Sequence, residues 1–176
     1  PQPYICHEGV LLMDMVADAE GNPAPRLNDV ELDENQALAF HELLVNQVVR
    51  MLCAGIVHGD LSEYNILVGA DGPVIIDLPQ AIDAAANSTA AEMLERDVLN
   101  LRTYFSTFAP ALSDSQYGKE IWGLYESGLL QPDQVLTGQV VLDDHLADVD
   151  AVLAAVDLAI RENEIRLMCR PGAESE

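Results

Sequence analysis

Basic residues are scarce in this sequence. Its 176 residues include only eight Lys and Arg against 30 Asp and Glu, so the formal net charge is −22. Lys119 is the single lysine of the chain. Binding to nucleic acid or to an anionic membrane requires clustered positive charge that neutralises phosphate groups. The shortage of bases therefore argues against direct contact of this chain with nucleic acid or with a membrane surface.

Cysteine is also rare, and long apolar runs are absent. The three cysteines lie far apart, unlike the framework of a secreted disulfide-rich domain, and they lack the paired spacing of a zinc site. We therefore expect reduced thiols and a cytoplasmic protein. No apolar stretch approaches the roughly 20 residues that span a bilayer, and the residues after Pro1 do not have the pattern of a signal peptide. Because Pro1 stands in place of an initiator methionine, we expect the chain to be part of a longer protein.

A short strand and a long helix are predicted in the first third of the chain. Residues 10–16 (VLLMDMV) are apolar except for one aspartate, which favours a buried strand. Residues 17–28 are rich in Pro, Gly and Asn and favour a loop. Asp33 and Gln36 have the spacing of a capping box, and apolar residues then recur at helical spacing. Gly55 is expected to end this helix.

The hydrophobic pattern changes to that of a β-hairpin after the first helix. Residues 66–68 and 74–76 are short aliphatic runs, and Gly69-Ala70-Asp71-Gly72-Pro73 lies between them. Such a composition is typical of a tight turn between two strands. The sequence therefore predicts one small hairpin between helices.

Three more helices are predicted after the hairpin. Capping boxes are suggested by two pairs of residues, Thr89 with Glu92 and Ser113 with Gln116. The helices that they begin are expected to reach about residues 104 and 127, and Gly128 would end the second. Apolar residues that recur over 146–160 predict a final amphipathic helix with an acidic outer face. The predicted fold class is therefore α+β, mainly helical with one small hairpin.

Oxygen-bearing side chains flank the hairpin on both sides. Asp60 and Asn65 precede its first strand, and Asp77 directly follows its second strand. Because a hairpin returns the chain to its starting point, these three side chains are expected to converge. Asn65 and Asp77 could supply the oxygen ligands that Mg²⁺ prefers, while Asp60 orients an attacking hydroxyl or accepts its proton. Alternatively, Asp60 and Asn65 are turn residues and Asp77 is a cap. His58 is interpreted as support for the loop backbone.

The segment around Asp60 resembles the catalytic loop of protein kinases. His58 to Asn65 (HGDLSEYN) matches H-R-D-x-x-x-x-N except that Gly59 replaces the arginine, and Asp77 has the position of the D-F-G aspartate. Asp77-Leu78-Pro79 replaces D-F-G, and no A-P-E follows. With these departures, HGDLSEYNIL…VIIDLPQAID is similar to the RIO family of atypical protein kinases, which lack the activation loop and the peptide-docking helices. The resemblance extends over about residues 10–108.

The resemblance implies the fold of a protein-kinase C-terminal lobe and a role for each residue around the hairpin. Asp60 would be the catalytic aspartate, and Asn65 and Asp77 would bind Mg²⁺, or Mn²⁺, together with ATP. The phosphoryl group would pass to a Ser or Thr hydroxyl of an unknown protein substrate or of the protein itself. In RIO proteins the aspartate that matches Asp77 can accept the phosphoryl group in an ATPase-like cycle, and this reaction is implied here too.

The resemblance also implies an adenine-binding region. Residues 10–16 would be the hinge between two lobes, with Met13 as gatekeeper. Backbone groups of Asp14 and Val16 would form hydrogen bonds with adenine, and Leu67 would form the floor of the pocket. From hydrophobicity alone, the same run is a core strand.

A kinase needs further parts that this sequence does not contain. It requires a glycine-rich loop over the phosphates and a strand lysine that contacts them. No G-x-G-x-x-G occurs, and Lys119 lies in a predicted helix far downstream. We therefore expect residues 1–16 to be the end of an N-lobe sheet and the hinge, and residues 17–176 to be the C-lobe. The N-lobe would lie upstream and be the partner of this chain.

Two other functions are alternatives to that of a RIO-type kinase. Small-molecule phosphotransferases of the aminoglycoside or choline kinase type share H-G-D-x-x-x-x-N and a following I-D. They typically read H-x-G-N where this chain has Ser62-Glu63-Tyr64-Asn65, and they carry a larger helical insertion. A non-enzymatic pseudokinase module is the other possibility. The presence of Asp60, Asn65 and Asp77 argues against it, because a scaffold does not need all three.

Overall fold

The computed structural model describes residues 1–139, and the elements of this part belong to the predicted α+β class. In chain order they are β1 (Pro3–His7), β2 (Val10–Met13), the 3₁₀ turn η1 (Leu27–Asp29), α1 (Glu34–Cys53), β3 (Ile56–Val57), the 3₁₀ turn η2 (Glu63–Asn65), β4 (Ile66–Gly69), β5 (Gly72–Ile75), β6 (Ile82–Asp83), α2 (Ala90–Phe105), the 3₁₀ turn η3 (Pro110–Leu112) and α3 (Tyr117–Glu126). Within residues 1–139, each sheet has two strands: β1 with β2, β3 with β6, and β4 with β5. Helices therefore supply most of the regular structure.

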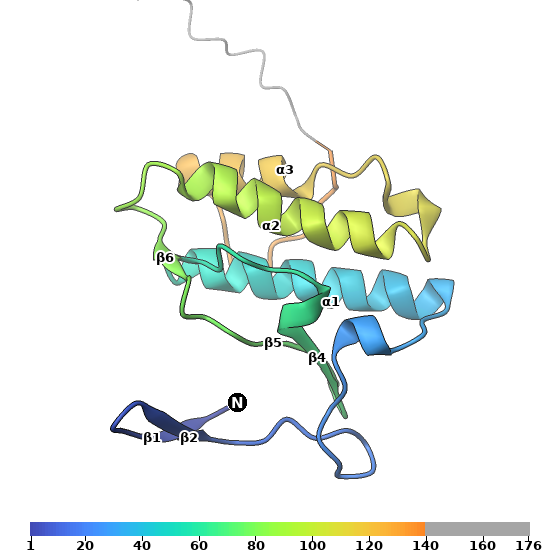
Figure 1. Ribbon diagram of the computed structural model, residues 1–176. Helices are drawn as coiled ribbons and strands as arrows, with labels where there is room; N and C mark the ends of the chain where they lie inside the picture. The colour runs from blue at the N-terminus through green and yellow to red at the C-terminus, as the bar shows by residue number, and fades with distance from the viewer. Residues whose placement is uncertain (140–176) are drawn as a thin grey trace, which may run out of the picture. The chain divides into compact units, whose positions relative to one another are not determined.

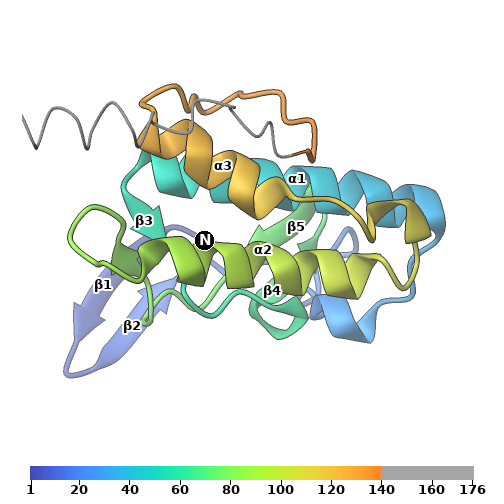
Figure 2. The same ribbon diagram turned by 90° about the horizontal axis from the view of Figure 1, so that it is seen from above.

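The core lies between the three helices, which run side by side (Figure 1 and Figure 2). Apolar side chains from each helix are buried there, among them Leu44 and Leu52 of α1, Leu101 and Phe105 of α2, and Ile121 of α3. Full burial of one such side chain stabilises a fold by about 1.5–3 kcal/mol. The apolar positions at helical spacing in the sequence are therefore the positions that hold the helices together.

The predicted capping box at the start of α1 is confirmed. The Asp33 carboxylate accepts a hydrogen bond from the Gln36 amide at 2.8 Å, and the Gln36 side-chain oxygen accepts one from the Asp33 amide at 3.1 Å. After the other end of α1, Gly55 has φ of +79°. Glycine adopts this left-handed conformation without strain, so the predicted helix end is confirmed as well.

The predicted hairpin is confirmed as β4 and β5. The strands are antiparallel, with Ile66 opposite Ile75 and Gly69 opposite Gly72. The turn is shorter than predicted, because Pro73 lies within β5 rather than in the turn. The Pro73 carbonyl accepts a hydrogen bond from the side-chain amide of Gln47 in α1 at 2.8 Å. This bond attaches the hairpin to α1.

The prediction of a buried strand over residues 10–16 was wrong in its extent and in its burial. β2 ends at Met13, and it pairs with β1, a strand that the sequence did not indicate. Both strands are exposed throughout; Val10 is 71% exposed and Met13 is 42% exposed. Figure 1 shows this hairpin standing apart from the helices. A two-stranded hairpin without a neighbouring layer buries neither of its faces.

Both capping boxes predicted after the hairpin were wrong, although the helices themselves are present. Thr89 directly precedes α2, but its side chain makes no capping hydrogen bond to the helix. Its hydroxyl donates to the side-chain oxygen of Asn87 at 2.8 Å instead. Ser113 follows the 3₁₀ turn η3, so α3 begins only at Tyr117. The end of α3 is as predicted, with Gly128 at φ of +69°.

Three further expectations are only partly covered by the described residues. The predicted amphipathic helix over residues 146–160 lies outside them. Among residues 1–139, no helix combines the length and the apolar character needed to cross a bilayer. Cys6 and Cys53 have free, exposed thiols.

His41 of α1 is a buried imidazole that makes stability depend on pH. Its ring is 2% exposed and packs against Phe105 and Tyr117, with centroid distances of 5.7 and 5.4 Å. The Nε2 atom is buried without a hydrogen-bond partner among the described residues. Burial lowers the pKa of His41 from its ordinary value of 6.5 to about 4. The native state therefore favours the neutral ring.

We expect the free energy of unfolding to fall as the pH drops from about 6.5 to about 4. In this window the unfolded chain protonates His41 and the native chain does not, and the total loss is about 3 kcal/mol. Above pH 6.5 the ring is neutral in both states and this contribution is fully present. Denaturant unfolding at several pH values measures the effect by comparing the chain with His41→Leu. The exposed His7→Gln serves as control, and parallel curves for the chain and His41→Leu would contradict the assignment.

Candidate active site

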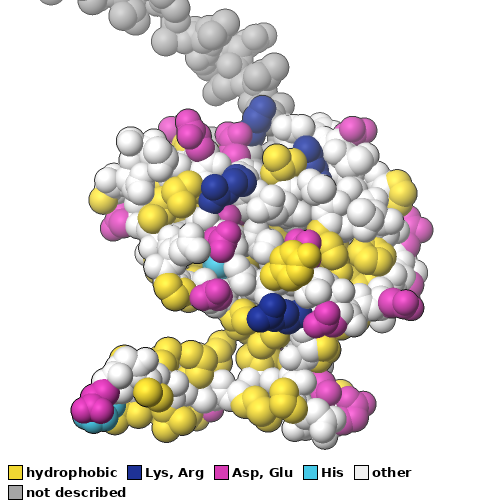
Figure 3. Space-filling model, in the orientation of Figure 1, with side chains coloured by type: hydrophobic (Ala, Val, Ile, Leu, Met, Phe, Trp, Pro, Cys, Tyr) yellow, Lys and Arg dark blue, Asp and Glu magenta, His cyan; other side chains and the backbone are white. Residues whose placement is uncertain are grey.

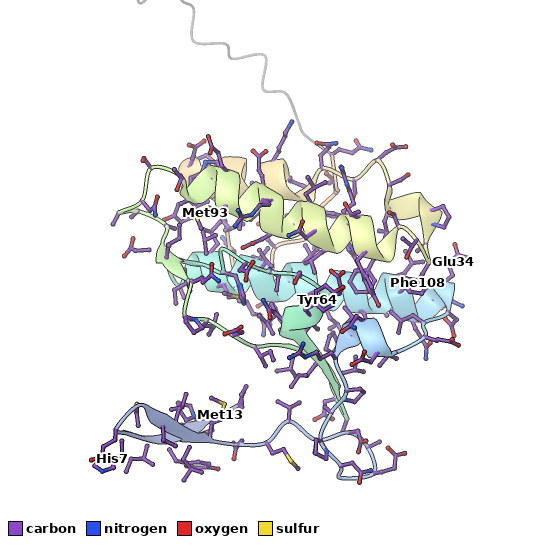
Figure 4. The ribbon with its side chains drawn as sticks, in the orientation of Figure 1. His7, Met13, Glu34, Tyr64, Met93 and Phe108 are labelled. Carbon is purple, nitrogen blue, oxygen red and sulfur yellow. The ribbon has the colours of Figure 1, made fainter. Side chains whose placement is uncertain are left out.

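The loop of residues 58–65, which contains Asp60 and Asn65, connects β3 to β4 (Tyr64 marks it in Figure 4). β3 pairs with β6, Ile56 opposite Asp83 and Val57 opposite Ile82. The chain before the loop therefore runs beside the chain that follows Asp77. The sequence did not indicate this pairing, because each of the two strands has only two residues.

His58 and Asn65 both bind the residue that precedes Asp77. The Nε2 atom of His58 lies 3.0 Å from the carbonyl oxygen of Ile76, and the Ile76 amide donates to the Asn65 carbonyl at 2.9 Å. Since a carbonyl only accepts, His58 Nε2 carries the proton, and Nδ1 accepts from the Asp60 amide at 3.3 Å. His58 is buried and supports the backbone, as the sequence predicted.

Asp60 and Asn65 are joined directly. The side-chain nitrogen of Asn65 donates to the Asp60 carbonyl at 2.8 Å, which leaves the Asn65 side-chain oxygen for another partner. The Asp60 carboxylate is exposed and accepts a long hydrogen bond of 3.3 Å from the Gln80 side chain. The structure thus brings Asp60 and Asn65 together and connects them to Asp77 through Ile76.

Asp77 has an unusual backbone conformation. Its φ is +69°, a left-handed value that residues other than glycine adopt rarely, although aspartate tolerates it better than most. The side chain is exposed and has no hydrogen-bond partner among residues 1–139. Strained residues of this kind concentrate at functional sites. The free carboxylate is compatible with a ligand role.

Asp97 of α2 is a residue of the site that sequence reasoning missed. Its carboxylate is 1% exposed and accepts hydrogen bonds from the amides of Gly59 at 2.7 Å and Leu61 at 2.9 Å. Burial raises the pKa of Asp97, and these two bonds and the nearby His58 and Arg96 act against that rise. The carboxylate therefore holds the two peptide groups on either side of Asp60 in a fixed position.

The sequence contained a signal for Asp97. It lies on the apolar stripe of α2 formed by Leu94, Val98 and Leu101, where a carboxylate is costly unless it is hydrogen-bonded. The next turn of α2 adds another contact, because the Asn100 side chain donates to the Leu61 carbonyl at 2.9 Å. A lone acid on a buried helix face indicates a buried backbone partner.

Gly59 is required where the kinase pattern has arginine. Its φ is +81°, and a Cβ atom there would lie 2.8 Å from the Cε of Met93 and 3.0 Å from the Gln80 carbonyl oxygen (Figure 4). The loop therefore packs too closely for a side chain at this position. Arg96 of α2 donates to the Gly59 carbonyl.

The structure brings only some of the residues expected to bind adenine together. Val16 lies beside β4, the strand that contains Leu67, whereas Met13 and Asp14 lie at the β1–β2 hairpin. Val16 lies beside the end of β4, since a Cβ atom on Gly69 would be 3.2 Å from the Cγ1 of Val16. Leu67 is on β4, and its backbone pairs with that of Arg26 in an isolated antiparallel β-bridge. Met13 and Asp14 belong to the exposed β1–β2 hairpin (Figure 4).

The backbone hydrogen bonds of the expected hinge determine which groups remain available. The Asp14 amide donates to the Gln2 carbonyl at 2.9 Å, and the Val16 carbonyl accepts from the Ala24 amide at 2.9 Å. The Asp14 carbonyl and the Val16 amide have no partner among residues 1–139. One acceptor and one donor two residues apart are therefore free.

No cluster of three or more His, Cys, Asp or Glu side chains able to hold a metal ion is present in the described part of the chain. An asparagine and an aspartate can still contribute two oxygen ligands, and Mg²⁺ takes its remaining ligands from water and phosphate. Asn65 and Asp77 have the hard oxygen donors that such a site needs.

Comparison with known proteins identifies relatives of one kind. The model of the RIO domain family matches residues 1–117. The chain is 39% identical over 105 residues to the RIO-type serine/threonine-protein kinase Rio1 of Thermoplasma acidophilum, which covers 60% of this chain and 53% of that protein. It is 36% identical over 118 residues to Rio1 of Haloferax volcanii, covering 66% of this chain and 39% of that protein. Human serine/threonine-protein kinase RIO1 is 32% identical over 113 residues, covering 64% of this chain and 20% of that protein. The chain thus spans about half or less of the length of these relatives.

Proposed function

Because this chain belongs to the RIO domain family, we propose that it is the C-terminal lobe of a RIO-type serine/threonine-protein kinase that acts in the cytoplasm. The observation that carries the proposal is the joint attachment of His58 and Asn65 to Ile76. It connects Asp60, Asn65 and Asp77 at one end of the β4–β5 hairpin. The reaction is transfer of the γ-phosphoryl group of ATP to a Ser or Thr hydroxyl, on a protein substrate or on the kinase itself.

Asp60 is the catalytic aspartate in this proposal. Its exposed carboxylate would accept a hydrogen bond from the attacking hydroxyl and take its proton as the new bond forms. Asp97 acts as a positioning residue, because its carboxylate holds the amides before and after Asp60. A rigid loop keeps the carboxylate in the geometry that the reaction needs.

Asn65 and Asp77 are the proposed ligands of Mg²⁺ or Mn²⁺. The Asn65 side-chain oxygen is free because its nitrogen is bonded to Asp60, and the Asp77 carboxylate is exposed. The bound cation would offset the charge of the ATP phosphates. Asp77 could also accept the phosphoryl group, in which case its carboxylate oxygen attacks phosphorus, ADP leaves, and water hydrolyses the acyl phosphate.

Adenine would bind between the hinge and β4. The Asp14 carbonyl would accept a hydrogen bond from the exocyclic amine, and the Val16 amide would donate one to a ring nitrogen. Leu67 would cover one face of the base, and Met13 would limit the depth of the pocket. These contacts cover only one side of the nucleotide.

The remaining contacts would come from an N-lobe that precedes this chain. In this assignment residues 1–16 are the end of the N-lobe sheet and the hinge, and residues 17–176 are the C-lobe. The exposed apolar side chains of β1 and β2 are what a pair of strands presents when the layer that covers its faces belongs to another part of the protein. A phosphate-binding loop and a strand lysine would be supplied from there.

We expect the 176-residue chain by itself to bind Mg²⁺-ATP no more tightly than a dissociation constant of about 1 mM, equivalent to about −4 kcal/mol. The phosphates would face an acidic protein without the lysine and the backbone cradle, so most of the electrostatic stabilisation is absent. Calorimetry with and without Mg²⁺ measures the binding, and radiolabelled ATP measures turnover.

Turnover by the chain should equal that of its Asp60→Asn variant, which is the matched control. Steady turnover above this control would contradict the need for an N-lobe. Binding of ATP that does not change with Mg²⁺ would contradict the proposed metal ligands.

A further inference from the structure

Positive charge gathers around one cavity of this acidic molecule. The cavity has a volume of about 430 Å³ and lies between α2 and the start of α3. Arg96, Arg102 and Lys119 all line it, and they are three of the five Lys and Arg residues in 1–139. Figure 3 shows several Lys and Arg side chains on the face that carries α2, separated by other side chains that include acidic ones.

None of these three cations forms a short ion pair with a carboxylate among residues 1–139, although the buried Asp97 carboxylate lies near Arg96. Within residues 1–139, the ion pairs shorter than 4.0 Å are Arg50 with Asp133 and His7 with Glu8. Glu92 and Glu95 line the cavity too, but neither forms such a pair with its cations. The cavity keeps its positive charge available.

Backbone N–H donors also line this cavity. Tyr117, Gly118 and Lys119 form the first turn of α3 and line the cavity. Their amides have no hydrogen-bond partner among the described residues, since the first helical bond runs from the Glu120 amide to the Gln116 carbonyl at 3.1 Å. The positive end of the helix dipole therefore adds to the charges of the side chains.

The two arginines are held in place by the backbone. One guanidinium nitrogen of Arg102 donates to the Ser115 carbonyl at 2.9 Å, and one of Arg96 donates to the Gly59 carbonyl. A guanidinium has five N–H donors, so each arginine retains several for a ligand. Fixed arginines lose less conformational entropy when they bind an anion than free ones do.

We propose that this cavity binds a single phosphoryl group, a phosphomonoester or inorganic phosphate dianion. Arginine forks, a lysine ammonium and free helix amides are the donors that recognise phosphate oxygens. Only three of the five Lys and Arg residues in 1–139 line the cavity, and the chain is strongly acidic, so longer polyanions such as nucleic acid are repelled outside it. None of the residues proposed to bind ATP or Mg²⁺ lines this cavity, although Arg96 also donates to the Gly59 carbonyl beside Asp60. The proposal does not depend on the proposed kinase activity.

Titration of the ¹⁵N-labelled 176-residue chain with inorganic phosphate tests the site. We expect saturable shifts of the amide signals of Tyr117, Gly118 and Lys119, with a dissociation constant of about 1 mM. Phosphoserine and a phosphoserine peptide form the second and third arms, with serine and the unphosphorylated peptide as neutral controls. Tighter binding of the phosphopeptide identifies a protein-borne phosphate, and equal affinities identify the free anion.

Two variants and one matched control locate the site. Lys119→Gln and Arg96→Gln should each weaken phosphate binding at least about fivefold, because each removes one charge at the cavity. Arg50→Gln removes the same charge at an exposed ion pair outside the cavity and should leave the affinity unchanged. An equal loss in all three variants, shifts without saturation, or equal responses to serine and phosphoserine would overturn the proposal.

Discussion

If the complete protein is the proposed kinase, replacing Asp60 with asparagine is expected to lower phosphoryl transfer at least about 100-fold, the scale of one general-base contribution. The loss arises because the amide cannot accept the proton of the attacking hydroxyl. Affinity for ATP should hardly change, since in the proposed mechanism the Asp60 carboxylate contacts the acceptor and not the nucleotide. Initial rates with saturating ATP, together with a nucleotide titration, separate the two effects.

Asparagine is the appropriate replacement because the fold does not depend on the Asp60 charge. The backbone carbonyl of Asp60 binds Asn65, and its amide binds His58, so both contacts survive the change. Asp71→Asn is a matched control, because Asp71 is exposed at the opposite end of the β4–β5 hairpin. An Asp60→Asn enzyme with the activity of this control would remove Asp60 from its proposed role.

Replacing Asp77 with glycine is expected to abolish the Mg²⁺ dependence of nucleotide binding and, with it, phosphoryl transfer. The carboxylate is the charged member of the proposed ligand pair, and without it the cation that bridges the phosphates is not held. Calorimetric titration of ATP with and without Mg²⁺ measures the difference directly.

Glycine is a more specific replacement than alanine at position 77, because the backbone there has φ of +69°. Glycine adopts this conformation freely, whereas alanine would add strain unrelated to the metal. Asp71→Gly removes the same charge at the hairpin tip and should leave the Mg²⁺ dependence intact. If Asp77→Gly also retained it, the metal would be bound elsewhere. Loss of a hydroxylamine-sensitive phosphate in Asp77→Gly alone would indicate a phosphoaspartate cycle.

Much of the local structure could be predicted from the sequence. The capping box of Asp33 and Gln36, the glycine that ends α1, and the β4–β5 hairpin depend on residues close together in the chain. The two capping boxes that failed, at Thr89 and Ser113, also had the correct spacing. There the hydroxyl groups were not used as predicted, because the local backbone formed other turns before each helix.

Burial of the first strand could not be predicted in the same way. The residues of β2 are as apolar as those of a core strand, and hydrophobicity alone does not specify which partner covers them. A strand becomes buried only when neighbouring strands or helices pack on it, which is a property of the tertiary arrangement. The residues of β2 are apolar, as the sequence indicates, but no strand or helix among residues 1–139 buries their side chains.

The candidate site also has features that the sequence determines and features that depend on tertiary packing. The sequence by itself determined the side chains and their spacing, because Asp60, Asn65 and Asp77 flank one short hairpin that is closed by a local turn. Only the tertiary structure decided that Asp97 holds the loop, since it lies 38 residues from Gly59 and meets it through the packing of α2. The grouping of Arg96, Arg102 and Lys119 also became apparent only in three dimensions. Turns and caps are governed by interactions within a few residues, whereas buried partners and shared cavities depend on how distant segments pack.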